Sequence, residues 1–153
     1  MNPIDRRRFI VLLGTAAFSG LALPASAASP FRRGKVDLVT AKGRYTLRVE
    51  IAETPSARML GLMHRTSMAA DAGMWFDFGE TAPVHMWMKD TPLSLDMIFL
   101  REDGSVAGVA HRTTPFSTAI ISSPEAVRYV LEVGAGTAAR LGLQAGDRIF
   151  GPR

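Results

Sequence analysis

The sequence predicts a mainly β fold, α+β if every element is counted, built as a compact antiparallel sandwich or a partly open barrel. Apolar and polar residues alternate with a period of two in several segments, which indicates half-buried strands. Helical spacing occurs in only two short segments, and no long helices alternate with strands as in a parallel sheet. We therefore expect about eight short strands and two short helices.

The first predicted elements are a β-hairpin and a helix. Residues 36–40 and 45–51 form the hairpin strands, and the second strand alternates strictly, with Tyr45, Leu47, Val49 and Ile51 on one face. Thr54 is a good N-cap and Pro55 suits the first helical turn, so a helix should run from here to about residue 63.

The remaining elements follow from the same periodicity and from turn residues. Asp103-Gly104 is a strong hairpin signal, and residues 113–124 are polar and bounded by proline, which makes them a candidate functional loop. The predicted strands are residues 73–78, 84–89, 95–101, 105–111, 127–133 and 148–150, with a second helix at 136–141.

Composition narrows the classes of function. The chain has 153 residues, of which 47% are hydrophobic, enough for one domain with its own core. It contains no cysteine, which excludes disulfides, a thiol nucleophile and a lipid-modified cysteine. The formal net charge is +4, but lysine and arginine are spread along the sequence, so we predict no nucleic-acid partner.

The N-terminus has the features of a signal peptide. The pair Arg6-Arg7 precedes the 15-residue uncharged segment Phe9–Leu23, and Ala25 and Ala27 form a small-x-small cleavage pattern. The arginine pair and Phe9 resemble the twin-arginine export signature. The alternative is an ordinary Sec signal with three arginines. An uncleaved anchor is disfavoured because the apolar segment is shorter than the ~20 residues that span a bilayer.

This leader predicts both the organisation and the location of the protein. Residues 1–27 would be the signal peptide, residues 28–35 a linker, and residues 36–153 a single domain. The twin-arginine export machinery would be the first partner, and the leader the only contact with the membrane before cleavage. We therefore predict a periplasmic protein that is soluble after cleavage.

The segment 84–100 contains charged residues within otherwise apolar sequence. Trp87, Lys89 and Asp96 are the notable ones, and a buried charge needs a partner. If strands 84–89 and 95–101 pair, Asp96 can reach Lys89. The result would be either an ion pair that stabilises the fold, or a small pocket in which Lys89 binds an anion and Trp87 forms the floor.

The methionines suggest a second interpretation. Apart from the initiator, all seven lie between Met59 and Met97, and His85-Met86-Trp87-Met88 combines imidazole with thioethers. These ligands suit Cu(I), so a copper site at His85, Met86 and Met88 is one alternative. The other is that methionine fills an irregular core, and on that basis we predict neither a metal nor another cofactor.

Known catalytic motifs are missing from the sequence. There is no Gly-x-Ser-x-Gly, phosphate-binding loop or His-Glu-x-x-His motif, so nothing in it requires an enzyme. The function we expect is that of a ligand- or partner-binding module. The alternatives are a periplasmic copper-binding protein and a small enzyme that uses Lys89 and Asp96.

Residues 36–149 resemble an uncharacterised prokaryotic family, domain of unknown function 192. The resemblance rests on Thr54-Pro55, Gly61-Leu62-Met63, Gly73-Met74, Trp87-Met88-Lys89-Asp90-Thr91, Leu95-Asp96, Tyr129-Val130-Leu131-Glu132-Val133 and residues 142–149. It implies a mainly β module, exported or cytoplasmic, with no established biochemical role. The chain departs from the family at Asp90, where asparagine is common, and at His64, where an aromatic residue is common. The loop 113–124 also lacks the cysteines of some members.

Overall fold

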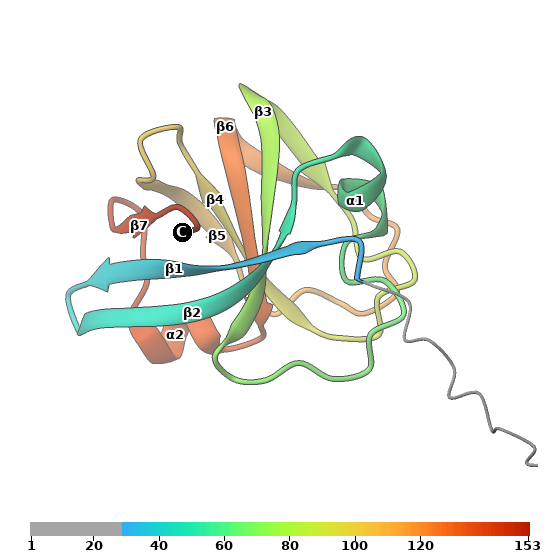
Figure 1. Cartoon of the computed structure of the whole chain (residues 1–153), viewed down its shortest axis with the longest axis horizontal. Coiled ribbons are helices and arrows are strands. Elements are labelled where there is room, and N and C mark those ends of the chain that lie inside the picture. The colour runs from blue at the N-terminus through green and yellow to red at the C-terminus, as the bar shows by residue number, and fades with distance from the viewer. Residues whose placement is uncertain (1–28) are drawn as a thin grey trace, which may run out of the picture.

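The computed structural model describes residues 29–153, so the predicted signal peptide lies outside the described residues. Within them, seven strands form one sheet in the order β5-β4-β6-β3-β2-β1-β7 (Figure 1). The elements are β1 (Arg32–Thr40), β2 (Gly43–Ala52), α1 (Pro55–Leu60), β3 (Ala72–Met86), β4 (Leu95–Leu100), β5 (Val106–Ala110), β6 (Ile121–Gly134), α2 (Thr137–Leu141) and β7 (Arg148–Phe150).

The sheet curls until its two edges meet at one end. Ser105, just before β5, forms a bridge with Arg148 of β7, and the Ile149 amide donates to the Gly104 carbonyl at 2.9 Å. Gly104 has φ +80°, and a Cβ here would lie 2.3 Å from the Ile149 oxygen, so only glycine fits this turn. The predicted mainly β fold is confirmed, and its form is the partly open barrel.

The strand count differs from the prediction because β3 is longer than expected. Residues 73–78 and 84–89 were predicted as two strands, but Ala72–Met86 is a single strand whose pairing with β6 shifts register between Asp77 and Ala82. Residues 78–81 form this irregularity, the ladder to β6 resumes at Ala82, and a second shift lies between Pro83 and His85. Lys89 therefore lies beyond the strand in which it was predicted.

One pair of neighbouring strands is parallel. β2 pairs in parallel with β3, whereas every other pairing in the sheet is antiparallel within the described residues. The connection between β2 and β3 carries α1, which begins as predicted with Thr54 as N-cap accepting from the Ala57 amide at 3.2 Å. α1 has only six residues and ends at Leu60, before the predicted end near residue 63, so it is shorter than the helix of a typical parallel crossover.

Two apolar clusters lie on opposite faces of the sheet. The first receives side chains from all seven strands and from α2, which is expected for the interior of the curled sheet. The second lies on the other face of the central strands, where α1 covers it. Successive residues of a strand point to opposite faces, so Trp75, Ile98 and Leu131 belong to the first cluster, whereas the residues before them belong to the second. The second cluster contains Phe31, Ala52, Ala57, Leu62, Met74, Phe76, Val84, Met86, Met88, Leu95, Met97, Phe99, Val127 and Val130.

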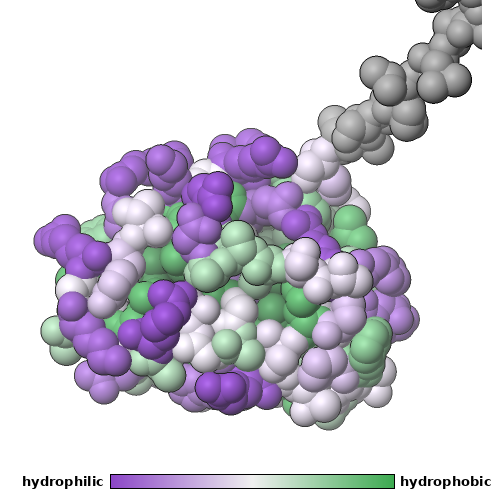
Figure 2. Space-filling model, turned by 90° about the horizontal axis from the view of Figure 1, so that it is seen from below, coloured by the Kyte–Doolittle hydropathy of each residue, from purple (hydrophilic) through white to green (hydrophobic). Residues whose placement is uncertain are grey.

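The surface is mixed in character. In the view from below, hydrophilic residues gather along the edges and apolar residues show between them (Figure 2). Among residues 29–153, no helix has the length and apolar character needed to cross a bilayer.

Candidate functional site

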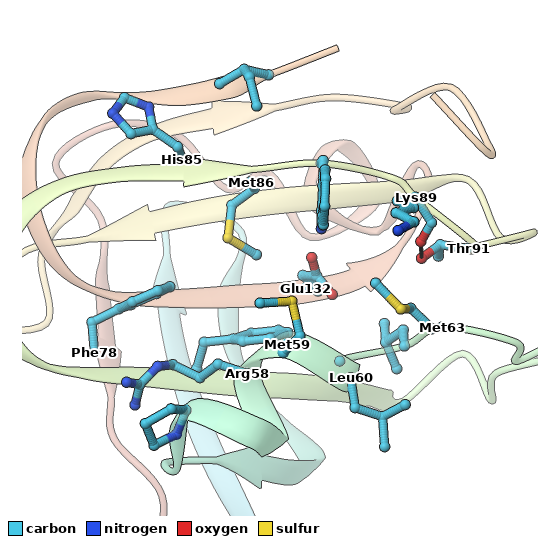
Figure 3. A pocket seen from close by; sticks show the side chains of 16 residues that line it. Arg58, Met59, Leu60, Met63, Phe78, His85, Met86, Lys89, Thr91 and Glu132 are labelled. Carbon is cyan, nitrogen blue, oxygen red and sulfur yellow. Dashed lines mark hydrogen bonds between the residues drawn. The ribbon is translucent and has the colours of Figure 1, made fainter. Parts of the chain in front are cut away.

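A cavity of about 430 Å³ opens on the face that carries the second apolar cluster. α1 and the residues after it form one wall, the end of β3 and residues 87–91 form another, and β6 contributes Glu132 (Figure 3). Most of the lining is apolar, including Met59, Met63 and Met86, whose side chains extend toward Glu132. The volume and the apolar lining are typical of small-molecule sites.

Glu132 is the unusual residue of this cavity. Its side chain lies on β6 between Met74 of β3 and Met97 of β4 and is only 4% exposed. Within residues 29–153 its carboxyl has no hydrogen bond or ion pair to the protein. Every side-chain nitrogen or oxygen that is completely buried in this part of the chain does have a partner. The Glu132 carboxyl therefore keeps its access to the cavity.

Burial has a direct electrostatic effect on this carboxyl. Desolvation raises the pKa of Glu132 from its usual 4.5 to about 8, because the charged form loses its hydration and gains no compensating partner. The side chain is therefore mostly a neutral acid at pH 7. A neutral carboxylic acid offers one O–H donor, and here no acceptor in the described chain takes it.

Trp87 and Lys89, two residues of the predicted pocket, line this cavity together. The Lys89 ammonium lies 5.3 Å from the centroid of the Trp87 ring, within the range of a cation–π contact. Met88 anchors the segment between them: its amide donates to the Ser117 carbonyl at 2.9 Å, and its sulfur accepts from the Thr113 hydroxyl at 3.2 Å.

The third predicted residue, Asp96, lies elsewhere, and the predicted ion pair with Lys89 is wrong. Asp96 is completely buried, and its two carboxylate oxygens accept from the backbone amides of Arg112 and Ala138, both at 2.9 Å. The prediction assumed that the strands carrying the two residues pair, but β6 lies between β4 and β3. Asp96 therefore joins β4 to the start of α2 and does not line the cavity.

Arg58 provides a second positive charge at the edge of the cavity. One of its terminal nitrogens donates to the backbone carbonyls of Glu53 and Asp77, each at 2.8 Å, and its guanidinium lies 5.5 Å from the Phe78 ring centroid. These contacts fix the arginine beside the opening and leave its charge uncompensated by any carboxylate within 4 Å in the described residues. Besides His85 and Thr91, the polar side chains that line this site are thus two cations and one neutral acid.

The structure does not gather the three residues of the predicted copper site. Met86 lines the cavity, but Met88 is completely buried and its sulfur already accepts the Thr113 hydroxyl. His85 is held by Ser122, with 3.0 Å between its Nδ1 and the Ser122 Oγ, and its ring points away from Glu132 (Figure 3). Residues 29–153 also contain no cluster of three His, Asp or Glu side chains suited to a metal ion.

Comparison with known proteins identifies the family. The sequence profile of the DUF192 family, described as "Uncharacterized ACR", matches residues 38–151. The chain belongs to the DUF192 family. No curated protein matches it significantly.

Two crystal structures are similar to this DUF192 chain. A protein from Sinorhizobium meliloti 1021, described as a candidate transcription regulator, is 52% identical, with a TM-score of 0.77 over 79% of this chain and 95% of that one. A protein of unknown function from Novosphingobium aromaticivorans DSM 12444 is 31% identical, with a TM-score of 0.79 over 90% of this chain and 99% of that one. The DUF192 fold is thus shared, and it leaves the role of the cavity to be argued from its residues.

Proposed function

We propose that this protein is a binding module that holds one small, largely apolar molecule in the cavity beside α1. The observation that carries the proposal is Glu132, a nearly buried carboxyl that has no partner among residues 29–153 and that lies at a cavity of about 430 Å³. A buried polar group left unpaired is costly. A ligand that forms a hydrogen bond with this carboxyl would remove the free-energy cost of leaving it unpaired, and this bond would make the site specific for such ligands.

Exposed apolar side chains support the same location. Six large hydrophobic residues of the described chain are exposed, and four of them line this cavity. These four are Met59, Leu60, Trp87 and Ile120. Exposed apolar groups that gather around a concavity are typical of binding sites, whereas scattered ones are common on any surface.

Methionine methyl NMR tests the proposal directly, with 1-octanol as the probe. Met59, Met63 and Met86 line the cavity, whereas Met68 does not. We expect 1-octanol to shift the methyl signals of the first three and to leave that of Met68 in place. Truncating a cavity aromatic removes contact area, so Trp87→Ala should weaken binding.

Phe150→Ala is the matched control for this variant, because it removes an exposed aromatic residue that does not line the cavity. It should bind 1-octanol like the unmodified protein. Equal shifts at all methionines, or no shift at any, would contradict a site beside α1. Catalysis by Lys89 and Asp96 is not part of this proposal, since Asp96 lies outside the cavity.

We also propose that the protein acts in the periplasm after twin-arginine export. The support is the N-terminal sequence alone, with Arg6 and Arg7 before an apolar segment and Ala25 to Ala27 at its end. Replacing both arginines with lysine should leave uncleaved precursor in the cytoplasm, measured by cell fractionation and immunoblotting. Normal export of this variant would instead indicate a Sec signal.

A further inference from the structure

The charged and titratable groups that line the cavity come from three parts of the fold. α1 contributes Arg58, β3 and the residues after it contribute His85 and Lys89, and β6 contributes Glu132. His85 is already bound to Ser122 and points away from Glu132 (Figure 3). The Arg58 guanidinium also points away from Glu132, and it lies over the Phe78 ring at the edge of the cavity (Figure 3). Lys89 and Glu132 therefore remain to contact a ligand, and Glu132 is the only carboxyl among the described residues that line the cavity.

Lys89 and Glu132, together with the charge of Arg58 at the edge of the cavity, favour a ligand that accepts hydrogen bonds. Arg58 and Lys89 are donors without any acceptor capacity. With its pKa raised to about 8 by burial, Glu132 is mostly protonated at neutral pH and donates through its O–H. Thr91 also lines the cavity, but its hydroxyl proton is donated to the Lys89 carbonyl at 3.0 Å.

We infer that the ligand is an amphipathic monocarboxylate, with its apolar body against the methionines and Trp87 and its carboxylate accepting from the Glu132 acid near Lys89. This inference rests on the proposed binding function and names the class of molecule that the same cavity takes. The two rim cations attract the anion, and a hydrogen bond between an acid and a carboxylate is among the stronger kinds.

An organic cation of the same shape fits less well. It would approach Arg58 and Lys89, whose charges repel it, and the neutral Glu132 acid would offer it only an uncharged carbonyl oxygen as acceptor. An alcohol would gain the apolar contacts but little from the rim charges. The head group of the ligand is therefore the variable that the experiment should change.

The experiment compares octanoate, 1-octanol and octylamine, which share one alkyl chain, by the same methionine methyl shifts. The measurement is made at about pH 6, where octanoate is ionised and the Glu132 carboxyl is protonated. We expect octanoate to bind at least about tenfold more tightly than octylamine and more tightly than 1-octanol. Lys89→Ala should weaken the binding of octanoate by about two- to fivefold, a small effect because the charge that it removes is exposed. The binding of 1-octanol, which carries no charge, should not change.

The pH profile isolates Glu132. Raising the pH from about 7 to about 9 should weaken octanoate binding about tenfold, because Glu132 loses the proton that it donates while octanoate stays ionised. Glu132→Gln retains an N–H donor at this position, so its octanoate affinity should be the same at both pH values. If that variant does not fold, the profile of the unmodified protein and the Lys89→Ala comparison still decide the outcome.

The possible results distinguish a failure of the carboxylate ligand from a failure of the proposed binding function. Equal or tighter binding of octylamine, or equal binding of 1-octanol and octanoate, would overturn the carboxylate ligand and leave the binding module intact. Octanoate binding that does not change between about pH 7 and 9 would also overturn it. No methyl shift with any of the three molecules would instead reject the proposed function itself.

Discussion

Replacing Asp96 with alanine is expected to lower the free energy of unfolding by about 3–5 kcal/mol. Asp96 is completely buried, and its carboxylate oxygens accept from the Arg112 and Ala138 amides. Alanine leaves both amide donors without this acceptor and removes the side chain that joins β4 to α2. Asp96→Asn keeps one acceptor oxygen and should lose about half as much, because its amide group faces a second donor.

Urea denaturation followed by circular dichroism measures these changes. The structure predicts that Lys89→Ala, which removes an exposed side chain, costs under about 1 kcal/mol. Because Lys89 and Asp96 are not paired, the double variant should be additive to within about 0.5 kcal/mol. A loss below about 1 kcal/mol for Asp96→Ala would show that the two backbone contacts matter little for stability. A double variant that departs strongly from additivity would contradict the structure and indicate that Lys89 and Asp96 do form an ion pair.

The second large effect is a loss of stability with rising pH that depends on Glu132. Its pKa is about 8 in the folded protein and its usual value is 4.5, so between these values the folded state binds more protons than the unfolded state. The free energy of unfolding therefore falls as the pH rises through this interval and levels off above it. The full contribution of this one group is about 4–5 kcal/mol.

Glu132→Gln separates this contribution from that of all other titrating groups. Unfolding free energies measured from about pH 5 to pH 9 should fall much less steeply in the variant than in the unmodified protein. The variant should consequently be the more stable of the two near pH 9. Parallel pH profiles for the two proteins would mean that the Glu132 carboxyl titrates normally and is well solvated.

The fold class could be predicted from the sequence because strands and helix ends depend mainly on residues that are close together in the chain. The strict alternation from Tyr45 to Ile51 reflects a strand with one buried face, and Thr54-Pro55 predicted the start of α1 through the requirements of a helix N-terminus. The parallel pairing of β2 with β3 was missed because it depends on where the chain returns after a 19-residue connection, from Glu53 to Asp71. No residue pattern within either strand specifies that neighbour.

The candidate site was predicted only in part, because some of its contacts join residues that are far apart in the sequence. Trp87 and Lys89 stood out as unusual residues in an apolar segment, and the structure places both at the cavity. Asp96 stood out equally, but its partners are backbone amides that no sequence pattern identifies. Glu132 was missed although it meets the same criterion, a charge within the apolar strand Tyr129–Val133. Applied along the whole chain, that criterion would have identified it.

The closure of the curled sheet has a consequence for the order of folding. β7 pairs with β1, and the Ile149 amide donates to the Gly104 carbonyl, so strands far apart in the sequence close the sheet. Contacts between residues so distant in sequence form slowly, because a long loop must close first. The β1–β2 hairpin, whose strands are joined by a short turn, is therefore expected to form before β7 closes the sheet.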